Sequence, residues 1–313
     1  MEYKISNRLK IGAIILIVLG VLGVSYGFWD SHHYETVDDV KELLANESHG
    51  GGEHATDSHA EEPHGEAHGE TAAHVEESHG NEVHADEGHK MSHEEHVLHQ
   101  IHNRPYSALY VAAFFFFMIA LGVLAFYAVQ YASQAGWSPV LFRVMEGITS
   151  YVLPGGLIVL LIVFIADKHL FIWLDPDVVA HDALIQGKES WLNKPWFFIR
   201  GLIFLGGWSL YRYFSRKFSV AQDNADVNDN RYFKKNFRIS AAFLVFFIYT
   251  ESMMSWDWIM SVDPHWFSTL FGWYVLAGML VCGITVIAMV AIYLKSKGLL
   301  EYVNDSHIHD LVK

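Results

Sequence analysis

Long apolar runs separated by short polar segments dominate this chain of 313 residues. A helix needs about 20 mostly apolar residues to cross a hydrocarbon layer roughly 30 Å thick. Six stretches reach or approach that length: 11–28, 106–132, 144–166, 196–214, 239–260 and 269–294. Lipid offers a backbone no hydrogen-bond partners, so each run is expected to be helical. The pattern predicts an all-α integral membrane protein with six transmembrane helices, because a divided soluble core does not explain six such runs.

The first apolar run follows a basic start, as it would in a secretory signal peptide. The run over 11–28 is longer than a usual signal core, and the Trp29-Asp30-Ser31-His32 that follows lacks the small-x-small cleavage pattern. We therefore expect residues 1–28 to form a retained anchor helix.

The formal charge of −14 is concentrated in one segment of the chain. Residues 29–104 contain 19 acidic and only 3 basic residues, a net of −16, so the rest of the chain is close to neutral. Most of this segment is a low-complexity mixture of His, Glu, Gly, Ala and Ser, with too little apolar surface to offset the entropy of folding. We expect a largely disordered His-rich loop, with disorder from about 48 to 95 and helical order resuming near His96. A short helix over 36–46 is expected, capped by Thr36 and Asp39.

Basic residues in short loops indicate which side of the membrane is cytoplasmic. With six spans, the N-terminus, the 133–143 loop, the 212–238 loop and the C-terminal tail share one side, and they carry 14 of the 21 Lys and Arg residues. The prediction is that both termini are cytoplasmic and that the 29–104 and 167–195 loops face outward, the first into the periplasm.

Three shorter features refine this arrangement. Pro154-Gly155-Gly156 in the third predicted span indicates a kink or a close helix contact. The tryptophan-rich 167–195 segment is typical of an interfacial hairpin with an aromatic belt. Residues 306–313 have the polar start of another helix, which fits either an amphipathic tail or a chain that continues into further spans.

Two carboxyl groups lie within the fifth predicted span, where a charge is costly. Glu251 is 13 residues beyond Arg238, about 20 Å along a helix, and Asp257 is more than one turn nearer the outer surface. Ser252 and Ser255 are placed to hold water or to bond a carboxyl. Such acids either pass protons or are structural groups bonded to a neighbouring helix. Glu251 has a further possible role, which is to supply polarity to a quinone site.

Four further polar residues are candidates for the same pathway. Asp263 and His265 close the fifth span, either as a simple helix stop or as a point of proton entry. Arg200 lies five residues into the fourth span and is expected either to reach outward to the headgroups or to pair with Asp257 or Asp263. Glu146 follows Arg143 by three residues, so a local ion pair is its plain alternative.

The histidines of the acidic loop are its most conspicuous chemical feature. His93, His96 and His99 recur at three-residue intervals and share a helix face, which makes them weak candidates for binding a divalent metal. No fixed metal site is predicted. The single cysteine, Cys282, excludes an internal disulfide and any thiolate-held cluster in this chain. The chain has no phosphate-binding loop, no basic groove for nucleic acid and no nucleophile–base motif.

One long run identifies a resemblance. Residues 243–275 (FLVFFIYTESMMSWDWIMSVDPHWFSTLFGWYV), with 134–155 and 293–311, closely resemble the quinone-binding-type membrane subunit 2 (ActF) of bacterial alternative complex III, in the NrfD/PsrC-like family. That complex is a quinol:cytochrome c oxidoreductase. The resemblance covers roughly 100–313 well and the first span loosely.

The resemblance implies a ten-span protein with two four-helix bundles. On that basis 105–262 form the first, NrfD-like bundle, and 263–313 contain the sixth span, the start of the second bundle and a cytoplasmic tail. The chain is therefore expected to be truncated by about four spans. The family also implies partners: an iron–sulfur subunit, c-type haem subunits and a paralogous quinol-binding membrane subunit. This chain itself is expected in the bacterial inner (cytoplasmic) membrane.

We therefore expect a membrane subunit that is not catalytic alone and binds no cofactor itself, in a complex whose substrate is menaquinol or another quinol. Haem c and iron–sulfur clusters would lie in partner subunits. The matching motif assigns a proton pathway to Glu251, Asp257, Asp263 and His265, with Glu146 in a shorter matching segment. Two other classes compete: a divalent-metal transporter that uses the His-rich loop, and a purely structural assembly subunit.

Overall fold

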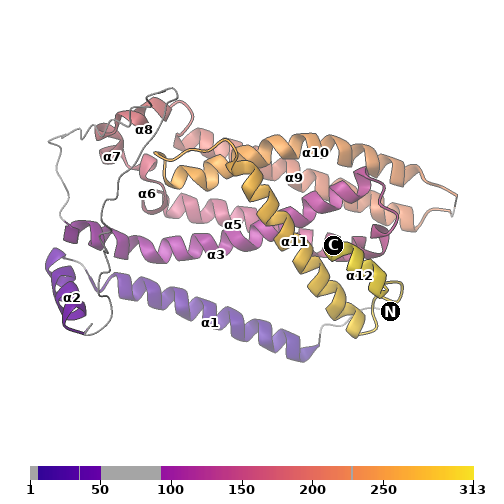
Figure 1. Ribbon diagram of the computed structural model, residues 1–313, viewed down its shortest axis with the longest axis horizontal. Coiled ribbons are helices and arrows are strands. Elements are labelled where there is room, and N and C mark those ends of the chain that lie inside the picture. The colour runs from indigo at the N-terminus through magenta and orange to yellow at the C-terminus, as the bar shows by residue number, and fades with distance from the viewer. Residues whose placement is uncertain (1–5, 35, 51–92, 227) are drawn as a thin grey trace, which may run out of the picture. The chain divides into compact units, whose positions relative to one another are not determined.

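The computed structural model describes residues 6–34, 36–50, 93–226 and 228–313, and every regular element in those ranges is a helix (Figure 1). The α-helices are α1 (Asn7–Ser31), α2 (Val37–Gly50), α3 (His93–Ala132), α4 (Phe142–Ile148), α5 (Val152–Ile165), α6 (Asp167–Leu170), α7 (Pro176–His181), α8 (Ala183–Lys188), α9 (Lys194–Asp223), α10 (Arg231–Trp258), α11 (Phe271–Ser296) and α12 (Asp305–Val312). Short 3₁₀ turns are η1 (Ser138–Leu141), η2 (Thr149–Tyr151), η3 (Ile172–Leu174) and η4 (Met260–Val262). The chain divides into two compact units, one of Met1–Trp29 with Asn103–Lys313 and one of Asp30–His102.

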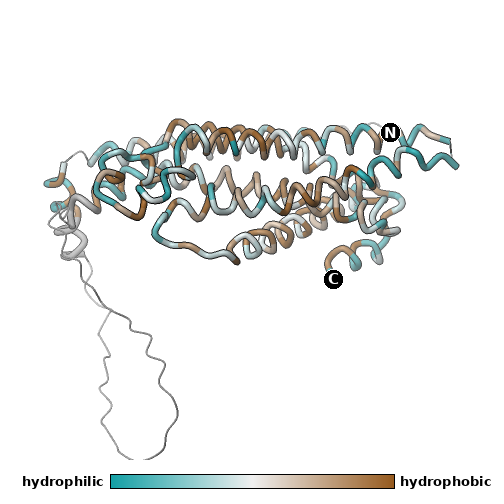
Figure 2. Tube along the Cα trace, turned by 90° about the horizontal axis from the view of Figure 1, so that it is seen from above, coloured by the Kyte–Doolittle hydropathy of each residue, from teal (hydrophilic) through white to brown (hydrophobic). Residues whose placement is uncertain are grey.

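Five helical segments in the described part of the chain are long and apolar enough to cross a membrane, which indicates a multi-pass membrane protein. They are Asn7–Ser31, Val97–Ala132, Ser138–Ile165, Arg231–Val262 and Phe271–Ser296. Hydrophobic positions concentrate along these helices, and the connections between them are more hydrophilic (Figure 2). The predicted span 196–214 lies in α9, which has 30 residues but is not one of the five. Arg200 and Arg212 interrupt its apolar stretch and lower its mean hydropathy.

The third predicted span is a helix with a break near its start. It comprises α4, the 3₁₀ turn η2 and α5, and Pro154 stands at the beginning of α5 where a proline costs no hydrogen bond. A Cβ at Gly156 would lie 2.5 Å from Cδ1 of Leu205 and 3.1 Å from Phe117. Of the two possibilities predicted for the proline–glycine segment, a close helix contact is present, to α9 and α3.

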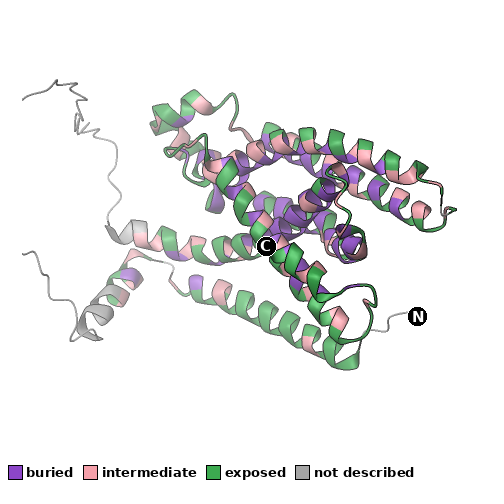
Figure 3. Cartoon of the chain, turned by 45° about the vertical axis from the view of Figure 1, so that its right-hand side comes forward, coloured by how far each residue is buried: buried purple, intermediate pink, exposed green. Residues whose placement is uncertain are grey.

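The core of the larger unit is formed by α3, α5, α9 and α10, and it is rich in aromatic rings. Trp258 is fully buried, and its ring centroid lies 5.9 Å from that of Phe117 and 6.5 Å from that of Trp208. The hydroxyl of Tyr110 donates a 2.6 Å hydrogen bond to the carbonyl oxygen of Trp258. In Figure 3 the buried residues lie on the faces that these helices turn toward one another. Large offset rings pack densely, so they hold the end of α10 firmly against α3 and α9.

Helix α11 crosses α3 where glycine replaces a side chain. A Cβ at Gly122 of α3 would overlap the backbone carbonyl of Met279, and a Cβ at Gly283 would lie 3.0 Å from the backbone nitrogen of Val123. The two backbones are therefore in direct contact, the geometry that small residues permit between membrane helices.

Helix α1 contacts the rest of its unit at one end. Its most apolar 18-residue stretch contains no buried residue, and Figure 3 shows most of its length exposed. Near its C-terminal end the Phe28 ring packs edge-on against Tyr106 with a centroid distance of 4.9 Å. The predicted anchor is thus a separate helix that is joined to α3 through its last turns.

The smaller unit contains the predicted capped helix. Thr36 and Asp39 form the expected reciprocal cap, with the Thr36 backbone N–H donating to Oδ2 of Asp39 at 2.8 Å and the Asp39 N–H donating to Oγ1 of Thr36 at 3.4 Å. The helix continues to Gly50 and not to residue 46, and α3 begins at His93, slightly before the expected restart near His96. The rest of the stretch predicted to be disordered lies outside the described residues.

The connection between α5 and α9 consists of short capped helices. Asp175 caps α7, Asp182 caps α8 and Asn193 caps α9, each by accepting from a backbone N–H of the following turn. At the far end of the chain Asn304 and His307 form a capping box that starts α12. These caps fix where α7, α8, α9 and α12 begin.

Candidate functional site

Glu251 lies in the last third of α10 and is 1% exposed. It precedes the helix end at Trp258 by seven residues, about 10 Å. Its Oε1 atom is buried and has no hydrogen-bond partner. The neighbouring hydroxyls of Ser252 and Ser255 were expected to bond water or a carboxyl, but they donate to backbone carbonyls of α10, those of Ile248 and Ser252. A buried polar atom without a partner is costly, so Oε1 of Glu251 is an unsatisfied acceptor in this part of α10.

Asp257, six residues further along α10, is fully buried and held by two donors. Its Oδ2 accepts from Nε of Arg200 at 2.6 Å, and its Oδ1 accepts from Nε1 of Trp191 at 2.8 Å. The guanidinium also lies over the Trp191 ring, 4.2 Å from its centroid, and donates to the Trp191 carbonyl oxygen. We call Asp257, Arg200 and Trp191 the Asp257 clamp. Of the two arrangements expected for Arg200, pairing with Asp257 is the one observed.

Asp263 and His265 lie beyond α10 and away from this clamp. Their side chains are 68% and 52% exposed. Nε2 of His265 bonds Oδ2 of Asp182 at 2.6 Å and so links the α10–α11 connection to the start of α8. Partial burial acts to raise the pKa of Asp182, but the backbone N–H groups of α8 and the His265 ring outweigh it and hold that pKa below its usual value. The structure therefore buries both Glu251 and Asp257 along α10, and places Asp263 and His265 in exposed positions, with His265 bonded to Asp182.

Glu146 is buried at the opposite end of the unit, near the α9–α10 connection. Its Oε1 accepts a 2.9 Å hydrogen bond from the Tyr127 hydroxyl, and its Oε2 accepts a 2.5 Å hydrogen bond from Nη1 of Arg143. The second amino group of Arg143 pairs with Asp223 at the end of α9. The local ion pair considered from the sequence is present, and it is part of a larger tyrosine–acid cluster of Tyr127, Glu146, Arg143 and Asp223.

A buried row of polar contacts between α9 and α10 was not predicted. Oγ of Ser215 donates to Oδ1 of Asn236 at 2.6 Å, and one turn away the Tyr211 hydroxyl and Oγ of Ser240 are 2.7 Å apart. All four residues are buried. We call them the α9–α10 polar ladder. The sequence signal for the ladder was a four-residue spacing: Tyr211 and Ser215 lie on one face of α9, and Asn236 and Ser240 lie on one face of α10.

Between the polar ladder and Glu251, most of the buried side chains of α10 and of the facing part of α9 are aromatic. Phe243 and Phe247 are buried there, and Trp208 of α9 donates from Nε1 to Oγ1 of Thr250 at 3.0 Å. Ser240 and Glu251 are eleven residues apart, about 16 Å along the helix. The buried acids and the polar ladder are therefore separate polar regions, with an apolar layer between them.

The histidine candidates for metal binding are only partly described. The side chains of His93 and His96 lie outside the described residues, and His99 is exposed. Within the part of the chain that is described, no group of three or more His, Cys, Asp or Glu side chains is arranged to hold a metal ion.

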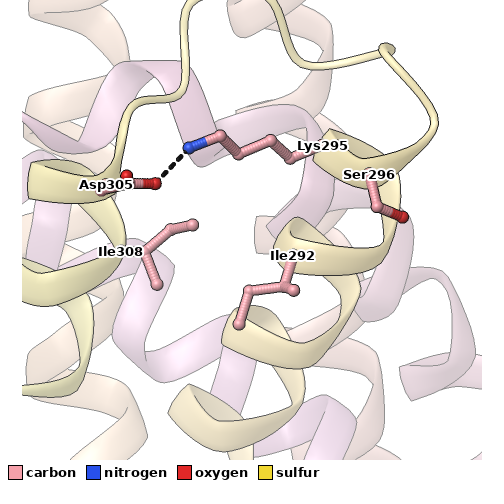
Figure 4. Close-up of a pocket in the computed structure, with 5 residues that line it drawn as sticks. All are labelled: Ile292, Lys295, Ser296, Asp305 and Ile308. Atoms are coloured by element: carbon pink, nitrogen blue, oxygen red, sulfur yellow. Dashed lines mark hydrogen bonds and ion pairs between the residues drawn. The ribbon is translucent and has the colours of Figure 1, made fainter.

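Two hollows on the larger unit differ in their free polar groups. One, of about 600 Å³, lies between α8 and the end of α10 and has Asp257 among its lining residues. The other, of about 520 Å³, lies between α11 and α12 (Figure 4). In this second hollow Nζ of Lys295 bonds Asp305 at 2.5 Å, and the Ser296 hydroxyl donates to a backbone carbonyl. Lys295 and Ser296 of the second hollow each have a partner, whereas Trp256 of the first hollow has a buried Nε1 atom without one. This difference favours the first hollow as a binding site.

Comparison with models of known protein families gives no match to this chain, and comparison with curated proteins gives none either. The similarity of 243–275 to the NrfD/PsrC-like family therefore remains a resemblance carried by that run of residues.

Proposed function

We propose that this chain is a membrane subunit of a respiratory quinol:cytochrome c oxidoreductase of the alternative complex III type, and that it provides a proton half-channel through Glu251 and Asp257. The observation that carries the proposal is the buried carboxyl of Glu251 on α10, whose Oε1 atom has no hydrogen-bond partner. Ionisable groups in a membrane interior are costly and mark proton or ion pathways. The motif around Glu251 supports the choice of complex.

The half-channel runs from the surface near α8 to Glu251. Asp257 lies six residues from Glu251, about 9 Å along α10, and is reached from the 600 Å³ hollow. Protons would pass between the two acids through water, because their side chains point to different sides of the helix. Beyond Glu251 the layer of Phe243, Phe247 and Trp208 closes the path, so Glu251 is its inner end.

The polar ladder and the tyrosine–acid cluster form a second polar region on the other side of that layer. Its hydroxyl and amide groups both donate and accept, as a proton relay requires. Transfer from Glu251 to this region needs a change in the aromatic layer. Such a change would couple proton movement to the working state of the complex.

The wider architecture follows from the same proposal. The chain would have six transmembrane helices, including α9, with an NrfD-like four-helix bundle over 105–262 and both termini cytoplasmic in the bacterial inner membrane. Quinol would be oxidised at a paralogous membrane subunit, and electrons would pass through iron–sulfur and c-type haem subunits. Arg200 would hold the carboxyl of Asp257 in place through its hydrogen bond. Glu146 would be the buried acid of the second polar region.

The test is Glu251→Gln in the intact complex. Glutamine keeps the size and polarity of the side chain but carries no exchangeable acid proton. We expect the complex to assemble with its haem content unchanged, while turnover under a proton gradient and the number of protons moved per electron both fall. The matched control is Glu189→Gln, an exposed acid outside the long helices, which should change neither quantity.

Two outcomes would reject the proton role. Unchanged turnover and unchanged proton stoichiometry in Glu251→Gln would show that the acid carries no protons. Loss of assembly in Glu251→Gln, with normal stoichiometry in the fraction that assembles, would favour the purely structural subunit.

A further inference from the structure

The hollow between α8 and the end of α10 has a structure suited to an amphipathic ligand. Its volume is about 600 Å³, within the range of small-molecule sites. Its walls include Trp191, Trp266, Phe267 and Met260, and Phe267 is 76% exposed. It lies at the end of the segment Arg231–Val262, which is apolar enough to cross a membrane, so we expect the hollow near the boundary between lipid and water.

The polar groups of this hollow have unused donor capacity. Nε1 of Trp256 is buried without a hydrogen-bond partner. Lys188 donates to the carbonyl oxygen of Pro264, and an ammonium group has three donors, so others remain available. The acidic residue of the lining, Asp257, already accepts from Arg200 and Trp191. An unpaired buried donor is costly, and an acceptor supplied by a ligand would remove that cost.

We propose that this hollow binds a phospholipid of the bilayer, with the phosphodiester oxygens accepting from Lys188 and Trp256 and the acyl chains lying along Phe267 and Met260. A charged acceptor suits an ammonium group, and the apolar wall beside it suits a hydrocarbon chain. A free phosphate ion would leave that wall uncovered. A quinone would offer Lys188 no charge. The hollow is also the outer end of the proposed half-channel. The lipid contacts are placed at Lys188 and Trp256, which take no part in proton transfer, and the binding measurement below gives the same result whether or not protons pass.

The experiment measures binding of dioleoyl phosphatidylglycerol to the detergent-solubilised full chain by native mass spectrometry. The variants are Lys188→Gln, which removes the charge, and Trp256→Phe, which keeps an aromatic ring but loses the N–H donor. The matched control is Lys168→Gln, an exposed lysine in the same connection between α5 and α9. We expect binding to weaken about tenfold in Lys188→Gln and about threefold in Trp256→Phe, with no change in the control.

Two competition arms identify the source of the acceptor. Inorganic phosphate at millimolar concentration should fail to displace the lipid, and decylubiquinone should bind with the same affinity to the wild type and to Lys188→Gln. Equal lipid binding in wild type, Lys188→Gln and Trp256→Phe would overturn the proposal. So would displacement by phosphate alone, or decylubiquinone binding that requires Lys188 while lipid binding does not. Thermal unfolding of each variant verifies that a loss of binding is not a loss of fold.

Discussion

Nε of Arg200 donates a 2.6 Å hydrogen bond to Oδ2 of Asp257, and this contact joins α9 to α10 inside the larger unit. The carboxylate is fully buried and the arginine side chain is only 12% exposed. Removing one partner from such a pair leaves the other charge buried and uncompensated, whereas replacing both with apolar side chains does not.

Arg200→Met is therefore expected to destabilise the protein by about 3–5 kcal/mol. The double variant Arg200→Met/Asp257→Leu should recover most of that loss. Thermal unfolding in one detergent measures both effects. Arg231→Met, at an exposed pair with Asp229, is the control and should have little effect. Equal destabilisation by the buried and the exposed substitution would contradict this account of the clamp.

The sequence predicted the helices well because length and hydropathy determine them locally. The run 239–260 lies within the segment from α10 to η4, and Pro154-Gly155-Gly156 marks both a break and a close contact. The sequence could not predict which side chains meet. Trp191 and Asp257 are 66 residues apart, and only the packing of the α5–α9 connection against α10 brings the indole to the carboxylate.

Asp182 and His265 show the same limit over 83 residues. Asp263 and His265 follow the acid-containing span so closely that both were grouped with the buried acids. The chain leaves the helix at Trp258, however, and turns to the surface. The polar ladder was missed for a different reason. Ser215 and Asn236 lie at or beyond the ends of the predicted spans, although α9 and α10 continue through them as helices.

The crossing of α3 and α11 gives a test of packing. Gly122→Ala places a methyl group on the backbone carbonyl of Met279, which cannot move without displacing α11. We expect a loss of about 1–3 kcal/mol in the free energy of unfolding. Gly278→Ala is the control, because a Cβ there meets nothing within 4 Å and alanine favours a helix. Thermal melts that shift equally for the two variants would show that α11 does not rest on this glycine.

Tyr127→Phe tests the tyrosine–acid cluster. The substitution removes one donor from the buried Oε1 of Glu146 and leaves the Arg143 pair in place. The expected cost is about 1–3 kcal/mol, measured as a lower midpoint of thermal unfolding. Tyr213→Phe, at a residue that is 60% exposed, should change the midpoint by much less. A Tyr127→Phe variant as stable as wild type would mean that Glu146 is fully satisfied by Arg143.

The contact between His265 and Asp182 predicts a pH dependence. The pKa of Asp182 is lower in the folded protein than in an unfolded chain. A lowered carboxyl pKa stabilises the folded state above the unfolded value, near 4, and this contribution is lost as the pH falls through the folded pKa. Hydrogen exchange of the amides of α8 should therefore accelerate, relative to the intrinsic rate, below about pH 4.

Asp182→Asn should remove that acid-dependent step, since its amide does not titrate in this range. Asp177→Asn, an exposed neighbour in α7, should retain it. If the step persists in Asp182→Asn, another group is responsible for it.

Asp257 and Trp258 are adjacent residues with opposite surroundings, and this adjacency limits how the acid site can open. One is held by Arg200 and the other by the Tyr110 hydroxyl and a shell of aromatic rings. A rotation of the end of α10 that frees the Asp257 carboxylate must also move the Trp258 indole against the aromatic rings that surround it. Exposure of the acid is therefore a concerted event of the whole helix end, slower than a single side-chain flip and sensitive to substitutions far from the carboxyl itself.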